Sequence, residues 1–172
     1  MSITFSKESL EIIGNMIKRY PEGKHKSALI PVLHIAQAEF GGWLSTETMD
    51  YVASVLNLKP IEVYEVASFY SMFNLKPVGK CVLEVCHTGP CAINGGEALV
   101  EYLSKKLNIK VGETTADGMF TLKAVECLGS CGTAPMLQCG AKYFENLTNE
   151  KTDELLDNLK KENRQYSYTD LI

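Results

Sequence analysis

Apolar residues recur three and four positions apart through the first part of the chain, a spacing typical of helices that bury one face. The first predicted helix begins after the capping residue Ser6 and ends before the helix breaker Pro21-Glu22-Gly23. A second predicted helix begins after Ser27 and ends at Phe40, where Gly41-Gly42 follows. Both segments are short and carry one apolar side.

Two further helices are predicted before residue 76. Ser45 is placed to cap the third, and Pro60 opens the fourth, at a position where the missing N–H of proline costs little. The apolar stripe of the fourth helix is expected to comprise Val63, Val66, Ala67, Tyr70 and Phe73. Four short helices with tight connections predict a small helical bundle over residues 1–76.

The pattern changes after a turn-rich stretch that contains Pro77 and Gly79. Beyond it, short apolar runs of strand-forming residues alternate with amphipathic segments. The predicted order is a strand over 81–86, a helix over 92–107, a strand over 120–125, a hairpin of 136–139 and 142–145, and a closing helix over 148–163. This order predicts helices packed on a mixed sheet over residues 77–172, so the whole chain is expected to be α+β with two domains.

The composition matches that of a soluble globular protein, with 45% hydrophobic and 22% charged residues in a chain of 172. A net charge of -4 with scattered lysines argues against nucleic-acid binding. The apolar stretches are too short for a membrane span and the N-terminus has no signal-peptide pattern, so we expect a cytoplasmic or matrix-like location without direct membrane insertion. Thiols stay reduced there, and the six cysteines therefore favour metal or catalytic roles over disulfides.

Four of the cysteines form two pairs, each directly after a predicted strand. Four residues lie between Cys86 and Cys91, three lie between Cys127 and Cys131, and 35 separate the two pairs. Loops that leave the same end of a sheet can face each other, so these two loops can place four thiolates around one small inorganic core. Four thiolates are the ligand set of a [2Fe–2S] cluster. Loop glycines are expected to let backbone N–H groups approach the sulfurs, and the candidates are Gly89, Gly129 and Gly132.

Spacing alone leaves an iron–sulfur cluster and structural zinc as alternatives, because four cysteines also suit zinc. A redox-active dithiol is disfavoured, since the usual motif has two residues between its cysteines. His87 is a further candidate ligand, as in Rieske centres, although four cysteines are already available. Cys81 and Cys139 lie in apolar, strand-like segments, and we interpret both as small buried hydrophobic residues.

The residues around these cysteines resemble those of a known family. The run from Val125 to Met136, together with the pair Cys86-x4-Cys91, resembles the thioredoxin-like [2Fe–2S] subunit of NADH:quinone oxidoreductase, respiratory complex I. The segments from Tyr143 to Thr148 and from Ala67 to Phe73 are similar to that family as well. The resemblance covers the chain from about Ser9 to Asn163.

The resemblance implies a thioredoxin-like ferredoxin domain with one [2Fe–2S] cluster per chain, held by Cys86, Cys91, Cys127 and Cys131. It implies an electron-transfer subunit without independent catalytic activity, bound to a larger partner subunit that carries FMN and the NADH site. Such a complex would place the chain on the inner face of the membrane, or on the matrix side in a mitochondrion. The same module occurs in NAD-linked hydrogenases and formate dehydrogenases, which remain alternatives beside a zinc-stabilised interaction module.

Two expectations concern the partner. The chain lacks the glycine-rich dinucleotide fingerprint that opens a helix after a strand, so NADH and FMN are expected to bind the partner subunit. The run Phe69-Tyr70-Ser71-Met72-Phe73 is rich in the residue types of interface cores and is predicted to dock on that partner. Packing of the run within the bundle is the alternative.

Overall fold

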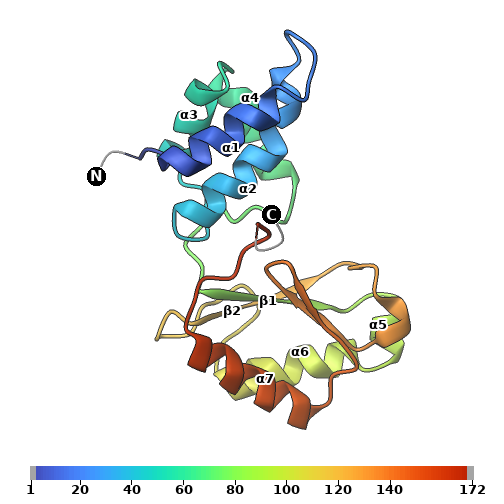
Figure 1. Ribbon diagram of the computed structural model, residues 1–172. Coiled ribbons are helices and arrows are strands. Elements are labelled where there is room, and N and C mark those ends of the chain that lie inside the picture. The colour runs from blue at the N-terminus through green and yellow to red at the C-terminus, as the bar shows by residue number, and fades with distance from the viewer. Residues whose placement is uncertain (1–2, 170–172) are drawn as a thin grey trace. The chain divides into compact units, whose positions relative to one another are not determined.

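A computed structural model describes residues 3–169 of the chain, which divides into two compact units between Pro77 and Val78 (Figure 1). Each unit has its own hydrophobic core. Across residues 3–169, no helix combines the length and the apolar character that a membrane crossing requires.

Residues 3–77 form four α-helices and one short 3-10 turn. The elements are α1 Lys7–Ile17, η1 His25–Ala28, α2 Leu29–Glu39, α3 Thr46–Val55 and α4 Pro60–Phe69. The hydroxyl oxygens of Ser6 and Ser45 accept the backbone N–H groups of Ser9 and Thr48, each at 3.1 Å, and so cap α1 and α3. All four helices predicted from the apolar spacing are therefore confirmed within this part of the chain.

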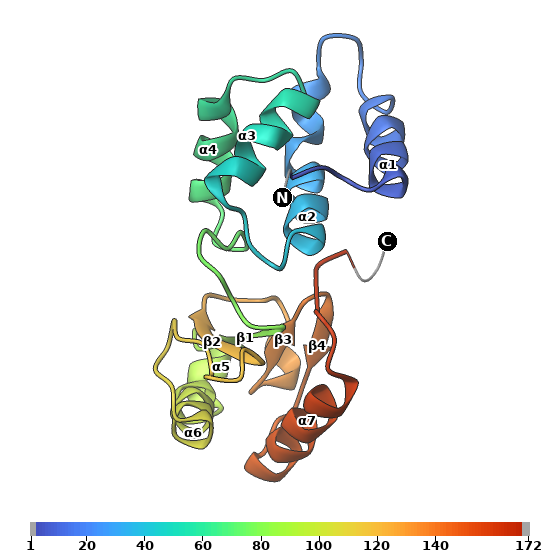
Figure 2. The same ribbon diagram turned by 90° about the vertical axis from the view of Figure 1, so that its left-hand side faces the viewer.

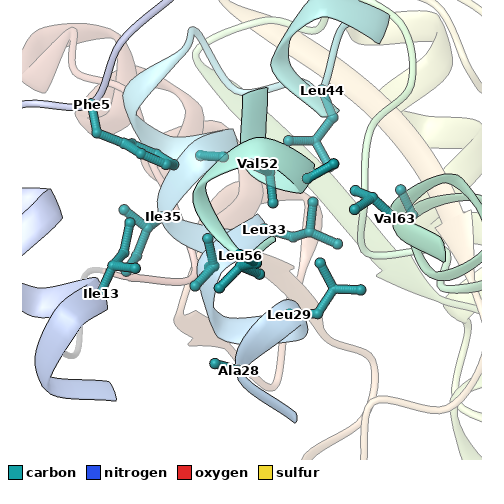
Figure 3. Close-up of a cluster of buried hydrophobic side chains, with 14 of the residues drawn as sticks. Phe5, Ile13, Ala28, Leu29, Leu33, Ile35, Leu44, Val52, Leu56 and Val63 are labelled. Atoms are coloured by element: carbon teal, nitrogen blue, oxygen red, sulfur yellow. The ribbon is translucent and has the colours of Figure 1, made fainter. Parts of the chain in front are cut away.

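The core of this unit lies between the apolar stripes of its helices (Figure 3). Leu33, Val52 and Val63 come from three different helices and are all fully buried. The predicted stripe of the fourth helix is wrong at its end, because α4 stops at Phe69 and Tyr70 has an extended backbone with φ -91° and ψ 119°. Phe73 is nevertheless buried, since the following turn brings its ring to 4.9 Å from the ring of His34.

Residues 78–169 form a four-stranded mixed sheet with helices. The elements are β1 Cys81–Cys86, α5 Pro90–Ile93, α6 Gly96–Leu107, β2 Phe120–Val125, η2 Cys131–Thr133, β3 Leu137–Cys139, β4 Lys142–Phe144 and α7 Asn149–Glu162. The strand order is β2-β1-β3-β4, with β1 parallel to β2 and the other neighbours antiparallel. The helical bundle and this mixed sheet confirm the predicted α+β class.

Helices α6 and α7 cover the same face of the sheet (Figure 2). Their side chains Leu103 and Leu159 pack in one buried cluster with Leu83 and Val85 of the central strand β1. Successive residues of a strand point to opposite faces, so Glu84 and the last residue of β1 point away from these helices. The sheet thus has one face that α6 and α7 cover and an opposite face, toward which the last residue of β1 points.

The predicted single helix over 92–107 is wrong, because the chain forms two helices separated by Asn94 and Gly95. Gly95 has a φ of +94°, a left-handed conformation that ends α5 and starts α6 in a new direction. Glycine populates this region without a steric penalty, whereas the apolar pattern of the segment carries no signal of the break.

We predict that Leu33→Ala lowers the free energy of unfolding of the helical unit by about 2–5 kcal/mol, because it removes a fully buried side chain and leaves a cavity. Leu10→Ala is the matched control, since Leu10 is 43% exposed and its loss should cost less than about 0.5 kcal/mol. Trp43 is the single tryptophan of the chain and lies in this unit, so its fluorescence reports the urea transition. Equal losses for the two variants would contradict the assignment of the core.

Candidate metal centre

The parallel pairing of β1 with β2 brings the two cysteine loops to one edge of the sheet. Cys86, the last residue of β1, is in register with Val125, the last residue of β2. The backbone N–H of His87 donates to the carbonyl oxygen of Val125 at 3.3 Å and continues the pairing beyond the strands. Because parallel strands end at the same edge, the predicted convergence of the loops is confirmed.

The first loop carries two buried thiols, Cys86 at the end of β1 and Cys91 on α5. Gly89 turns the chain into α5 with a φ of +50°, and the N–H of Cys91 donates to the carbonyl oxygen of Thr88 at 3.1 Å. Helix α6 starts directly against this loop. A Cβ on Gly96 would lie 2.7 Å from the carbonyl oxygen of Cys86 and 2.9 Å from that of Cys91, so only glycine allows this packing.

The second loop brings the sulfurs of Cys127 and Cys131 to 3.6 Å from each other. Gly129 lies between them with a φ of +84°, and its N–H donates to the Cys127 Sγ at 3.4 Å. The prediction that loop glycines direct N–H groups at sulfur is therefore confirmed at Gly129. Gly132 has a φ outside the left-handed region, and a Cβ there would meet open space, so the backbone does not require glycine at this position.

The four thiols lie close enough to perturb one another. The pKa of the Cys91 thiol is raised to about 11, first by burial and then by Cys86, Cys131 and Cys127 in that order. The pKa of Cys131 is also raised, first by its contact with Cys127. Repulsion between neighbouring thiolate charges therefore contributes to both increases.

Backbone N–H groups favour the thiolate form of Cys86. Burial raises the pKa of this thiol, but the N–H groups of Thr88 and Leu128 and the Cys91 thiol outweigh burial, so the pKa falls below its usual value. Leu128 belongs to the second loop, so this hydrogen bond also joins the two loops. Sequence reasoning missed both donors, since a backbone N–H leaves no signal in the residue type.

Strand β4 and the residue after it hold the second loop from outside. The Glu145 carboxylate accepts a hydrogen bond from the Thr133 hydroxyl at 2.6 Å and another from the Ser130 hydroxyl. It therefore holds the chain on both sides of Cys131. The Tyr143 hydroxyl donates to the carbonyl oxygen of Leu128 at 2.5 Å. Sequence reasoning assigned no role to either residue, although both lie in the segment from Tyr143 to Thr148 that resembles the family.

Cys81 and Cys139 lie away from the loops, as predicted. Both are fully buried in the core between the sheet and its helices. The pKa of Cys81 is lowered, first by a hydrogen bond with Cys139. Cys81 starts β1 on the face opposite Cys86, so the interpretation of both residues as buried core residues is confirmed.

The donor set suits a two-iron cluster. The Cys91 thiol interacts with the other three thiols, and the sulfurs of Cys127 and Cys131 lie 3.6 Å apart. Soft thiolates in this number are the ligands that iron–sulfur clusters take, and the surrounding N–H groups offset their negative charge.

Paired thiols at adjacent strand ends of a mixed, helix-covered sheet are typical of a protein that binds a metal centre through cysteine. The profile of the thioredoxin-like [2Fe-2S] ferredoxin family matches residues 13–160, and the chain belongs to this family. The resemblance inferred from the cysteine runs is thereby confirmed.

Relatives in other organisms extend over most of the chain. It is 46% identical over 156 residues to an NADH-quinone oxidoreductase subunit of Rickettsia felis, with 91% of this chain and 93% of the relative covered. It is 43% identical to the mitochondrial NADH dehydrogenase [ubiquinone] flavoprotein 2 of Dictyostelium discoideum, covering 91% of this chain and 63% of the relative.

A solved structure shares the fold. The NAD+-reducing [NiFe]-hydrogenase in its air-oxidized state superposes with a TM-score of 0.67 at 21% identity, over 78% of this chain. The chain spans 23% of the length of that hydrogenase chain.

We predict that Glu145→Ala speeds the release of iron from the cluster-loaded chain to a chelator several-fold, because the second loop loses its two hydroxyl anchors around Cys131. Loss of visible absorbance over time measures the rate. Glu101→Ala is the control, since Glu101 is an exposed carboxylate on α6 that pairs with Lys105. Equal rates in the two variants would show that Glu145 does not hold the loop.

Proposed function

We propose that this chain is an electron-transfer subunit that holds one [2Fe–2S] cluster on Cys86, Cys91, Cys127 and Cys131. The observation that supports this most strongly is the pair of adjacent parallel strand ends, each of which delivers two thiols to one edge of the sheet. Family membership supports the same cluster type. A bound cluster of this kind takes up and releases one electron at a time.

The chain's own residues are suited to stabilise such a cluster. The N–H groups of Thr88 and Leu128 donate to Cys86, and the N–H of Gly129 donates to Cys127. These donors compensate the negative charge of thiolates, which is costly to bury beside Met136 and Leu128. The alternative of a structural zinc site is less well supported, because the family model that matches residues 13–160 is that of a [2Fe-2S] ferredoxin.

We further propose that the chain works in the NADH dehydrogenase module of an NADH:quinone oxidoreductase. The relatives at 46% and 43% identity carry NADH-quinone oxidoreductase and NADH dehydrogenase names and align with 91% of the chain. The partner is then a subunit that carries FMN and the NADH site, and the assembly is peripheral on the inner face of the membrane. A role in a hydrogenase or formate dehydrogenase is the second candidate, supported by the fold shared with the hydrogenase.

The helical unit offers a surface for that partner. Phe69 is 79% exposed at the end of α4, and Ile61 on the same helix and Tyr70 are exposed as well. Phe73 and Met72 pack on the core of the unit instead. The first part of the aromatic run is thus exposed and its second part is packed on the core. We propose that the exposed part docks on the flavin-bearing subunit.

We predict that the purified chain is brown and contains two irons, and that replacing any one of Cys86, Cys91, Cys127 or Cys131 by Ala removes or strongly destabilises the cluster, because each change deletes one of four thiolates. Iron and zinc content per chain and visible absorbance are the measurements. Cys81→Ala and Cys139→Ala are the controls and should keep the cluster, since both residues lie in the core of the sheet.

Two results would contradict this assignment. A colourless chain with one zinc would establish the alternative metal site. Iron retained in Cys91→Ala but lost in Cys81→Ala would show that the ligands are wrongly assigned.

We also predict that a chain truncated to begin at Val78 keeps its visible spectrum but no longer binds the flavin-bearing subunit. The motivation is that residues 78–169 form their own core around β1, whereas the exposed aromatic residues lie before the boundary. Co-purification with the partner is the measurement. Binding as tight as that of the full chain would refute docking by the helices, and failure to hold iron would refute independent folding of the two domains, 1–76 and 77–172.

A further inference from the structure

Tyr143 reaches the second cysteine loop from the edge strand of the sheet. Its register partner on β3 is Gln138, which in turn pairs with Glu84 on β1. Directly paired residues share a face, and Cys86 lies two positions beyond Glu84, so Tyr143 stands on the same face of the sheet as Cys86. Tyr143 is 46% exposed, and its hydroxyl donates to the carbonyl oxygen of Leu128 at 2.5 Å.

The carbonyl that Tyr143 contacts belongs to the peptide group between Leu128 and Gly129. The N–H of that same peptide group is the one that donates to the Cys127 Sγ at 3.4 Å. The left-handed φ of Gly129, +84°, turns the chain sharply after this N–H, toward Cys131. A continuous series of two hydrogen bonds therefore runs from the tyrosine hydroxyl through one peptide group to a cysteine sulfur.

Hydrogen bonds in series strengthen one another. A donor at the carbonyl oxygen polarises the amide and makes its N–H a stronger donor, by about 10–30% per bond. An N–H that points at a cluster sulfur stabilises the negative charge that the cluster gains on reduction, and such hydrogen bonds are among the determinants of the reduction potential. A stronger N–H donor at Cys127 therefore favours the reduced form.

We propose that Tyr143 is a positioning residue that raises the reduction potential of the cluster by polarising the Leu128–Gly129 peptide group toward Cys127. The proposal rests on the proposed function, because it requires Cys127 to be a cluster ligand. Tyr143 touches neither a cysteine sulfur nor a reacting atom in this role. Its effect is transmitted through the backbone of the loop.

The test compares the midpoint potentials of the full-length cluster-loaded chain and its Tyr143→Phe variant. The change removes one hydroxyl and leaves the ring. We expect the substitution to lower the equilibrium constant for reduction of the cluster about two- to threefold, which at 59 mV per tenfold for one electron lowers the midpoint potential by roughly 20–30 mV. Titration with dithionite, followed by visible absorbance and by the electron paramagnetic resonance of the reduced cluster, gives the midpoint.

Tyr102→Phe is the matched control. Tyr102 is a tyrosine of the same unit whose hydroxyl donates to Asp153 at 2.6 Å, on the helices and not on the loop. Its removal should leave the midpoint unchanged. An unchanged or raised midpoint in Tyr143→Phe, or an equal decrease in both variants, would overturn the proposal.

Replacement of Tyr143 by 3-fluorotyrosine decides the matter independently of whether the phenylalanine variant keeps its iron. The fluorinated phenol keeps the side chain and is a stronger donor, so at a pH where it stays protonated the midpoint should rise. A purely structural role predicts no rise, and that result would overturn the proposal. Iron content of the unaltered chain is measured first, so a failure of the proposed function is recognised before any potential is compared.

Discussion

The parallel pairing of β1 with β2 is the constraint on which the rest of the site depends. It sets Cys86 beside Val125, so that the loops after the two strands start at the same edge of the sheet. A slip of one residue along either strand would turn that strand's alternating side chains to the opposite face, and the buried contacts of Leu83 and Val85 with α6 and α7 oppose such a slip. The helix-covered core of the second unit thus fixes the position of thiols that lie outside it.

The loops themselves are held by the backbone and by one edge strand. The Cys86 sulfur accepts hydrogen bonds from backbone N–H groups of both loops. The hydroxyl of Tyr143 and the carboxylate of Glu145 tie the second loop to the end of β4. These contacts restrain loops that have no regular backbone hydrogen bonding of their own. The same loops carry sulfurs that repel one another when ionised. Hydrogen-bond donors at sulfur are therefore structural supports and, on the proposed function, determinants of the potential at the same time.

The regular elements could be predicted from the sequence, and much of the site could not. Strands 81–86 and 120–125 were predictable to the residue because continuous apolar runs with flanking turns leave few alternatives. The break at Gly95 was missed, because it depends on the left-handed backbone of Gly95 and on the close packing of Gly96 against the carbonyl oxygen of Cys86. The roles of Leu128, Tyr143 and Glu145 were also missed, since they arise from contacts between segments and not from any pattern within one.

The two thiol pairs differ in their surroundings, and the difference decides which contacts stabilise each pair. Cys86 and Cys91 are buried beside Met136 and Leu128, and the N–H groups of Thr88 and Leu128 stabilise the thiolate form of Cys86 there. Cys127 is exposed, so solvent shares the charge of its sulfur with the N–H of Gly129. The hydrogen bonds from Tyr143 and Glu145 to the second loop therefore restrain the more exposed pair of thiols, whereas packing in the apolar cluster with Met136 restrains the buried pair.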